Sequence, residues 1–239
     1  MGTQFASHVS TTSTGISPAV VGLGAPRPSG AAAHQIAPGT AVFSEGDAAD
    51  SVFEVVSGTL RLHKVLVDGR RQIIGFVSGG RLLGVSQQGE YLCTAEALTP
   101  VVLRRHARAA FNRRIDEEPG LARLLLTEMC NELRVAQDQM LLLGRKSALE
   151  KVASFLLALA IDKDGNFLEH VELPMSRTDI ADYLGLTTET VSRTFTRLRA
   201  DGLIALPCAA SVRFLDIDEL EEVAAGNGDD DSWARKGGW

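Results

Sequence analysis

Short apolar segments separated by glycine-rich turns fill the chain from about residue 40 to residue 106. In Thr59–Val67, leucines alternate with polar residues, which is the period-two pattern of a half-buried strand. Asp68-Gly69 is a strong two-residue hairpin signal, and Arg70–Val77 supplies the returning strand. Further strand-like runs are Ser51–Val56, Tyr91–Ala97 and Pro100–Arg105. Many short strands at regular spacing predict an antiparallel sandwich or barrel.

The period of the apolar residues changes after Pro119-Gly120, where a long helix is predicted. Six apolar residues then recur at spacings of 3, 4, 3, 4 and 3: Leu126, Met129, Leu133, Ala136, Met140 and Leu143. This spacing is typical of a coiled-coil seam. The neighbouring leucines add a second apolar surface: Leu124, Leu125, Leu141 and Leu142. One interpretation is a helix that packs only on its own domain. Two apolar surfaces instead favour contact with a partner chain as well, so we predict a homodimer.

Gly144 and the basic pair Arg145-Lys146 are expected to interrupt this helix, and a separate domain is predicted beyond them. Ser147 is suited to cap a helix over Ala148–Ile161, and a short strand is expected over Phe167–Leu173. Two later strands joined by a short loop resemble the wing of a winged helix: Leu203–Leu206 and Val212–Leu215. Residues 216–225 are predicted to form a final helix.

A helix-turn-helix is indicated by the spacing of residues from Arg177 onward. With Arg177 as the first position, Ala181 is the fifth, Gly185 the ninth and Val191 the fifteenth. A small fifth residue lets two helices cross closely, and glycine permits the tight turn between them. The β-branched fifteenth residue is expected to lie buried between the helices.

The second helix of this motif is expected to begin near Thr188 and to bury Val191, Phe195 and Leu198. Its opposite face carries Glu189, Ser192, Arg193 and Thr196. Arginine pairs with guanine, glutamate accepts a hydrogen bond from cytosine N4, and serine or threonine adapts to several bases. Residues 188–199 hold three arginines against one glutamate, a net +2. A solvated face with an intrahelical pair between the glutamate and Arg193 is the alternative interpretation.

Composition fits a cytoplasmic protein without membrane contact. The length of 239 residues corresponds to one large or two small domains, and 45% hydrophobic residues are enough to form a core. The sequence contains no apolar run of the ~20 residues that a membrane span needs. The beginning of the chain does not have the pattern of a signal peptide. The net charge of −6 does not exclude nucleic acid, because the distribution of basic residues decides that question. Three widely spaced cysteines argue against a disulfide framework or a zinc site, and we expect no metal.

Across about residues 40–225 the sequence resembles the CRP/FNR superfamily of bacterial transcription regulators. The first matching stretch resembles the cyclic-nucleotide-binding-type β-roll and comprises Phe43-Ser44-Glu45-Gly46-Asp47, Ser57-Gly58, Asp68-Gly69-Arg70 and Gly84. The second, Met175–Leu203, is similar to the helix-turn-helix of the family, and Glu189-Thr190-Val191-Ser192-Arg193 matches the FNR-type recognition helix. The overall pattern, including Asp68–Gln72 and Leu173–Leu186, is most similar to the FixK-like branch.

This resemblance implies an α+β fold with an N-terminal β-roll, a long dimerisation helix and a C-terminal winged helix-turn-helix. With the composition of the two ends, it divides the chain into a flexible leader (1–38), β-roll (39–118), dimerisation helix (119–144), winged helix (145–225) and flexible tail (226–239). The implied function is transcription regulation, as an activator of genes for low-oxygen or nitrogen-oxide-linked respiration. Double-stranded DNA, RNA polymerase and a second copy of the chain are the implied partners.

The matched recognition helix implies a palindrome similar to TTGAT-N4-ATCAA. The expected base-reading residues are Thr188, Glu189, Ser192 and Arg193. Candidates for phosphate contacts are Arg177, Thr196, Arg197 and Arg199. Two-fold symmetry requires the half-sites to lie about one helical turn apart, ~34 Å.

The resemblance also suggests effectors, which the residues can test. In nucleotide-binding relatives a glutamate follows the glycine turn and an Arg-Ser pair holds the phosphate, but here Val85 follows Gly84 and Cys93-Thr94 replaces that pair. A phosphate would lose its bidentate arginine, so we expect no cyclic AMP. An iron–sulfur cluster needs four thiolates, whereas no cysteine precedes Cys93, so we expect no cluster.

Haem-dependent gas sensing is the alternative within the superfamily, with His63, His106 or Cys93 as axial ligands. Such histidines are more often surface or satisfied core residues. Cys208 in the wing is a candidate for oxidation, although a lone cysteine is usually inert. Our leading hypothesis is that no cofactor is required and that the amount of protein sets the level of transcription. This hypothesis follows from the resemblance to FixK-like members.

Proteins of other classes fit less well, and we expect no enzyme activity. A cupin-type enzyme would need clustered metal ligands, but the histidines are scattered: His8, His34, His63, His106 and His170. A ligand-binding module that controls a protein partner would leave the residues of the recognition helix without a role. Replacing Arg193 distinguishes that hypothesis from DNA binding.

Overall fold

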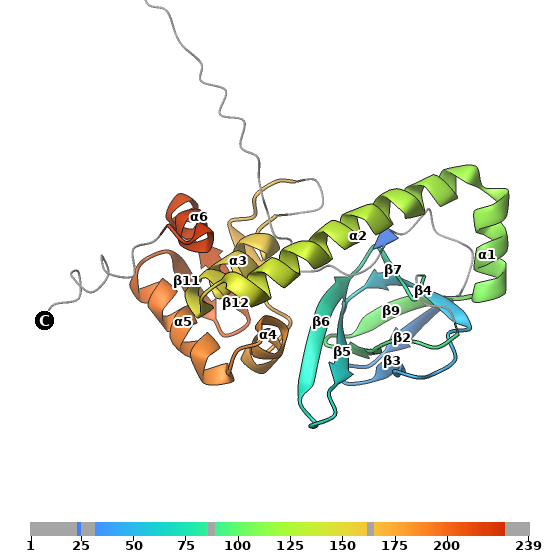
Figure 1. Cartoon of the computed structure of the whole chain (residues 1–239), viewed down its shortest axis with the longest axis horizontal. Coiled ribbons are helices and arrows are strands. Elements are labelled where there is room, and N and C mark those ends of the chain that lie inside the picture. Colours follow the sequence, from blue (N-terminus) through green and yellow to red (C-terminus); the bar gives the residue numbers. More distant parts are fainter. Residues whose placement is uncertain (1–22, 25–31, 86–88, 162–164, 228–239) are drawn as a thin grey trace, which may run out of the picture.

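The computed structural model describes residues 23–24, 32–85, 89–161 and 165–227. A β-rich unit lies at one end, a long helix extends from it, and a helical unit with a small sheet lies at the other end (Figure 1). This arrangement confirms the predicted α+β architecture of β-roll, long helix and C-terminal helix-turn-helix.

In the described part of the chain the β-roll consists of two antiparallel sheets, one with strand order β1-β7-β4-β9-β2 and one with order β3-β8-β5-β6. The strands are β1 Leu23–Gly24, β2 Ala33–Ile36, β3 Ala41–Phe43, β4 Ser51–Ser57, β5 Thr59–Val65, β6 Arg71–Ser78, β7 Arg81–Leu83, β8 Thr94–Ala97 and β9 Val101–Ala107. Apolar side chains from both sheets form one core, in which the rings of Phe43 and Tyr91 stack with centroids 3.9 Å apart. The predicted hairpin is confirmed, since β5 pairs with β6 across a turn in which Gly69 has a φ of +83°.

The predicted leader is too long, because residues 33–36 belong to the β-roll as β2. This strand pairs with β9 in a register that runs from Ala33 opposite Arg104 to Ile36 opposite Val101. Its sequence, Ala-His-Gln-Ile, lacks apolar alternation, so its strand conformation depends on pairing with β9. Leu23–Gly24 likewise pairs with β7, whereas residues 1–22 and 25–31 lie outside the described residues.

The strands β3 and β7 and the helix α1 (Arg108–Glu117) were not predicted from the sequence either. Helix α1 buries only Phe111 fully, so no repeated apolar stripe marks it in the sequence. It leads to helix α2 (Pro119–Arg145), which has proline in its first turn and ends one residue beyond the predicted end. The predicted interruption by Gly144 and Arg145-Lys146 is confirmed to within one residue, because Gly144 and Arg145 are the last residues of the helix and Lys146 follows it as the C-cap.

The C-terminal unit contains four helices and a three-stranded sheet in the order β10-β12-β11, counting the described residues alone. Its elements are α3 Ala148–Leu159, β10 His170–Glu172, α4 Arg177–Leu184, α5 Thr188–Ala200, β11 Ile204–Cys208, β12 Ser211–Phe214 and α6 Ile217–Ala225. Ser147 caps α3 as predicted, since its side chain accepts a hydrogen bond from the Glu150 amide. The strand expected over Phe167–Leu173 is shorter than predicted. Of the predicted tail, residues 228–239 lie outside the described residues.

Helix α2 joins the cores of the two units. Leu121 and Leu125, near its beginning, pack into a core beneath the β-roll, whereas Leu142, near its end, belongs to the core of the C-terminal unit. Within the described residues, α2 and every other helix is too short or too polar to cross a lipid bilayer.

Candidate nucleic-acid interface

Helices α4 and α5 form the predicted helix-turn-helix. Helix α4 ends at Gly185, whose φ of +63° and ψ of +42° place it in the left-handed region that favours glycine. Ala181 and Val191 lie buried at 2% and 0% exposure, at the two positions where the spacing predicts packing between the helices. Residues within the motif therefore determine the turn between α4 and α5 and the packing of one helix on the other.

Helix α5 separates an apolar face from a polar face. Thr187 caps its beginning by accepting a hydrogen bond from the Thr190 amide at 3.2 Å. Val191, Phe195 and Leu198 are buried, as predicted. The residues of the opposite face are exposed: Glu189, Ser192, Arg193 and Thr196. This polar face is the part of the motif that is open to a partner.

The groups on the exposed face suit base edges. Backbone hydrogen bonding at the helix N-terminus lowers the pKa of Glu189, and the Thr187 hydroxyl and the charge of Arg193 lower it further. The carboxylate is therefore ionised at neutral pH and acts only as an acceptor. Ser192 Oγ donates to the Thr188 carbonyl oxygen at 2.8 Å, which leaves lone pairs able to accept from a base. Thr188 itself is half-buried at the beginning of α5, and its Oγ1 lies 3.5 Å from Thr178 Oγ1.

The four phosphate candidates differ in their surroundings. Thr196 and Arg199 are exposed, and Arg197 is half-buried with its Nε 3.8 Å from Asp201 Oδ2. Arg177 is half-buried, with its guanidinium carbon 3.5 Å from the centroid of the Phe195 ring. Stacking on an aromatic face stabilises a cation and here ties the beginning of α4 to the buried face of α5. No spacing in the sequence indicates this packing role.

The predicted dimer seam is an exposed apolar stripe along α2. All six of its residues are exposed in the single chain: Leu126, Met129, Leu133, Ala136, Met140 and Leu143. Met140 has an exposed fraction of 71%, whereas Leu125 and Leu142 on the other side of the helix are buried. Leu124 and Leu141 are exposed as well, so they extend the stripe rather than the inward face. An exposed apolar surface of this kind marks an interaction site.

The side chains around Gly84 make contacts within the β-roll. Cys93 is buried, and Thr94 Oγ1 already accepts a hydrogen bond from the Glu45 amide at 3.1 Å. The nearby Arg108 guanidinium donates to backbone carbonyls, among them that of Gly84 at 2.6 Å and that of Ser51 at 3.2 Å. No arginine in these contacts is available to a phosphate.

The other candidate sensor residues are dispersed. The described residues contain no group of three or more His, Cys, Asp or Glu side chains placed to hold a metal ion. His106 Nε2 lies 3.6 Å from a Glu54 oxygen, and His63 is buried in the β-roll at 8% exposure. Cys208 is exposed in β11, with its Sγ 3.3 Å from Ser211 Oγ.

The burial of His63 predicts that the stability of the fold falls in mild acid. Desolvation, the largest effect, lowers the pKa of His63, and the charges of Arg61 and Arg71 act in the same direction. Glu96 and Asp179 oppose this shift without reversing it. The unfolded chain therefore takes up a proton near the ordinary pKa of 6.5 before the folded chain does, so stability is full above that pH and declines as pH falls below it.

The replacement His63→Gln should flatten this decline. Denaturant unfolding at about pH 7.5 and about pH 5.5 is expected to show a smaller loss of unfolding free energy in the variant than in the wild type. Equal losses in the two proteins would contradict the assignment of this pH dependence to His63.

Comparison with known proteins places both units in described families. Residues 150–223 match the model of the Crp-like helix-turn-helix domain, and residues 33–118 match that of the cyclic nucleotide-binding domain. The chain is 47% identical over 191 residues to the nitrogen fixation regulation protein FixK of Bradyrhizobium diazoefficiens, which covers 78% of this chain and 79% of that protein. It is 44% identical over 190 residues to the transcriptional activatory protein AadR of Rhodopseudomonas palustris, with 79% of each chain covered.

A solved structure is similar over the same extent. The structure of FixK2 from Bradyrhizobium japonicum superimposes with a TM-score of 0.75 at 36% sequence identity, covering 81% of this chain and 96% of that chain. The similarity therefore includes the β-roll, the long helix and the helix-turn-helix together.

Proposed function

Because the chain belongs to the CRP/FNR family of DNA-binding transcription regulators, in its FixK-like branch, we propose that it binds as a homodimer to a palindrome similar to TTGAT-N4-ATCAA and activates transcription there. The observation that carries this proposal is the exposed polar face of α5. The activator role agrees with the printed name of the AadR relative, a transcriptional activatory protein. RNA polymerase is the implied protein partner, and the cytoplasm is the implied location.

The residues of α5 match the half-site chemically. TTGAT contains a G·C pair, whose guanine offers O6 and N7 to the Arg193 guanidinium and whose cytosine offers its N4 amino group to the Glu189 carboxylate. Arg193 and Glu189 lie four positions apart on one exposed helix face, so both can address the same step of the major groove. Ser192 and Thr188 lie beside them and supply hydroxyl groups for neighbouring bases.

The palindrome requires two copies of this helix. Pairing of the α2 stripe with that of a second chain would bury the exposed Leu126, Leu133 and Met140, which have exposed fractions of 65%, 62% and 71%. A two-fold axis along this seam relates the two α5 helices, which then lie in successive major grooves about 34 Å apart. The seam thus accounts for both the exposed stripe and the symmetry of the site.

We further propose that DNA binding requires neither cyclic AMP, haem nor an iron–sulfur cluster. Val85 and Cys93-Thr94 stand where nucleotide-binding relatives have their ribose and phosphate ligands, and Arg108 is occupied by backbone carbonyls. The amount of protein would then set the output.

Selection of binding sites from random duplexes tests this function. Protein purified in air without added ligand should enrich a palindrome with TTGAT-like halves and a four-base-pair spacer. Parallel selections with cyclic AMP or haem should give the same motif with equal enrichment. Enrichment of no motif, or enrichment only in a ligand-containing arm, would contradict the proposal.

A further inference from the structure

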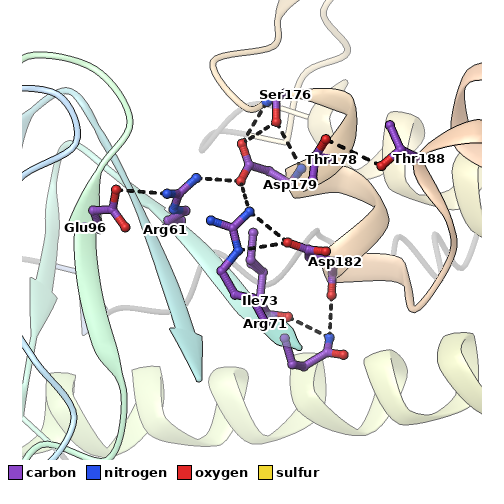
Figure 2. A network of polar contacts seen from close by, with 10 residues as sticks. Arg61, Arg71, Ile73, Glu96, Ser176, Thr178, Asp179, Asp182 and Thr188 are labelled. Atoms are coloured by element: carbon purple, nitrogen blue, oxygen red, sulfur yellow. Dashed lines mark hydrogen bonds and ion pairs between the residues drawn. The ribbon is translucent and has the colours of Figure 1, made fainter. Parts of the chain in front are cut away.

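A cluster of charged residues connects the β-roll to the first helix of the helix-turn-helix (Figure 2). Arg61 of β5 donates from Nη1 to Asp179 Oδ1 of α4 at 2.6 Å and from Nη2 to Glu96 Oε1 of β8 at 2.9 Å. Arg71 of β6 donates from Nη2 to the same Asp179 oxygen at 2.9 Å and from Nε to Asp182 Oδ2 at 2.8 Å. We refer to these five residues as the interdomain cluster.

Asp179 lies at the centre of this cluster and is held ionised. Its side chain has an exposed fraction of 4%, so an unpaired charge there would be costly. Burial raises the pKa of Asp179, but hydrogen bonds from Ser176 and the charges of Arg61 and Arg71 outweigh that effect and hold the pKa below its ordinary value. The charge therefore depends on the hydrogen bonds from Ser176 and on two arginines that the β-roll supplies.

The same carboxylate determines where α4 begins. Asp179 Oδ2 accepts hydrogen bonds from the Ser176 amide at 3.0 Å and the Ser176 hydroxyl at 2.7 Å, while the Ser176 Oγ accepts from the Asp179 amide at 3.1 Å. This capping box fixes the first turn of the helix. One oxygen of Asp179 thus serves the cap of α4 and the other serves the β-roll.

Neutral contacts reinforce the charged ones along β6. Gln72 Nε2 donates to the Asp182 carbonyl oxygen at 2.7 Å. The rings of Phe76 and Tyr183 lie with centroids 5.5 Å apart, and Tyr183 Oη donates to Gln139 Oε1 of α2 at 2.9 Å. The β5–β6 hairpin, α2 and α4 are therefore joined in one interface.

In this arrangement the exposed polar face of α5 is not covered by the β-roll. Glu189, Ser192 and Arg193 are exposed while α4 is bound to the hairpin, and the hydroxyls of Thr178 and Thr188 connect α4 to the first residue of α5 (Figure 2). The contact between the two units thus coexists with an accessible recognition helix.

We propose that the interdomain cluster is a latch that holds the winged helix in the orientation that binds DNA. The proposal rests on the proposed function, and it gives a physical reason why no effector would be needed: the arginines of the hairpin supply the free energy that a ligand supplies in a ligand-dependent regulator. When the binding-competent orientation is a small fraction of the population, the apparent dissociation constant rises in proportion.

The variant that tests the latch is Arg61→Gln combined with Arg71→Gln, which leaves the capping box of α4 intact. We expect the dissociation constant for the TTGAT-N4-ATCAA duplex to rise about ten-fold or more, because the released winged helix populates other orientations. The matched control is Arg70→Gln, which removes one positive charge from the same hairpin. The Arg70 side chain is 77% exposed and pairs with Asp68 two residues away, so this variant should bind as the wild type does.

Hydrogen exchange of the DNA-free proteins provides a second measurement. Amides of β6 and α4 should exchange faster in the double variant, whereas those of the β4–β9 pair in the interior of the β-roll should not change, which shows that the variant is folded. This measurement does not require the duplex, so it tests the latch even if the wild-type protein fails to bind it. A wild-type protein that does not bind would contradict the proposed function, whereas the exchange result would still show whether the cluster holds the two units together.

A double-mutant cycle tests the ion pair between Arg71 and Asp182. Asp182→Asn removes a half-exposed partner of Arg71 without affecting the cap, and the effects of Arg71→Gln and Asp182→Asn on exchange and on DNA affinity should be less than additive.

Unchanged exchange and affinity in the double variant of Arg61 and Arg71 would overturn the latch. Tighter DNA binding by that variant would also overturn it, because the cluster would then hold an inhibited orientation.

Discussion

Replacement of Arg193 by alanine is expected to abolish the preference for a TTGAT-N4-ATCAA duplex over a scrambled duplex of the same length. A bidentate contact between arginine and guanine contributes about 1–3 kcal/mol of discrimination. Each protomer supplies one such contact, so the palindrome would lose about 2–6 kcal/mol, equivalent to a fall of about 30-fold or more in relative affinity. Arg193 is exposed on α5 and outside the buried face, so the fold should be unaffected. Competition binding with both duplexes measures the change.

Arg199→Ala is the matched control for this experiment. Arg199 is exposed on the same helix, but it lies outside the expected base-reading set and is a candidate for a phosphate contact. Its loss should weaken binding to both duplexes by the same factor and reduce the salt dependence of binding. A regulator that acts on a protein partner would show no such difference between the variants, and an Arg193→Ala protein that retains its preference would contradict the base-reading role.

Replacement of Met140 by glutamate is expected to dissociate the dimer and thereby to weaken operator binding. Met140 lies on the exposed stripe of α2 with an exposed fraction of 71%. In a paired seam, each chain would bury one unpaired carboxylate near the two-fold axis, at a cost on the order of several kcal/mol. Sedimentation velocity should show monomers at concentrations where the wild type is a dimer.

The control for the seam is Gln137→Glu, which places the same charge on an exposed position of α2 outside the six seam residues. This variant should remain a dimer and should bind DNA as the wild type does. An unchanged dimer in Met140→Glu would exclude the seam as the dimer interface.

Features determined by neighbouring residues could be predicted from the sequence. The helix-turn-helix depends on Ala181, Gly185 and Val191, which lie within fifteen positions of Arg177, and the structure confirms both its turn and its packing. The β5–β6 hairpin depends in the same way on Asp68-Gly69. In each case a local backbone requirement selects a residue type that can be recognised in the chain.

Features that depend on distant partners could not be predicted. Residues 33–36 form a strand only because β9 lies beside them, and α1 buries a single phenylalanine. The interdomain cluster joins Arg61 and Arg71 to residues more than 100 positions away, so no spacing in the sequence indicates it. Ion pairs of this kind become visible only when tertiary packing brings the partners together.

Ligand-independent, sequence-specific DNA binding is tested by an equilibrium titration of the wild-type protein in air with no added ligand. Labelled duplexes would carry TTGAT-N4-ATCAA or a scrambled site, at one fixed salt concentration because phosphate contacts make affinity depend on salt. Tight binding to the palindrome by a dimer, with much weaker binding to the scrambled duplex, is the predicted result. Equal affinity for the two duplexes, or a preference that emerges only with cyclic AMP or haem, would contradict it.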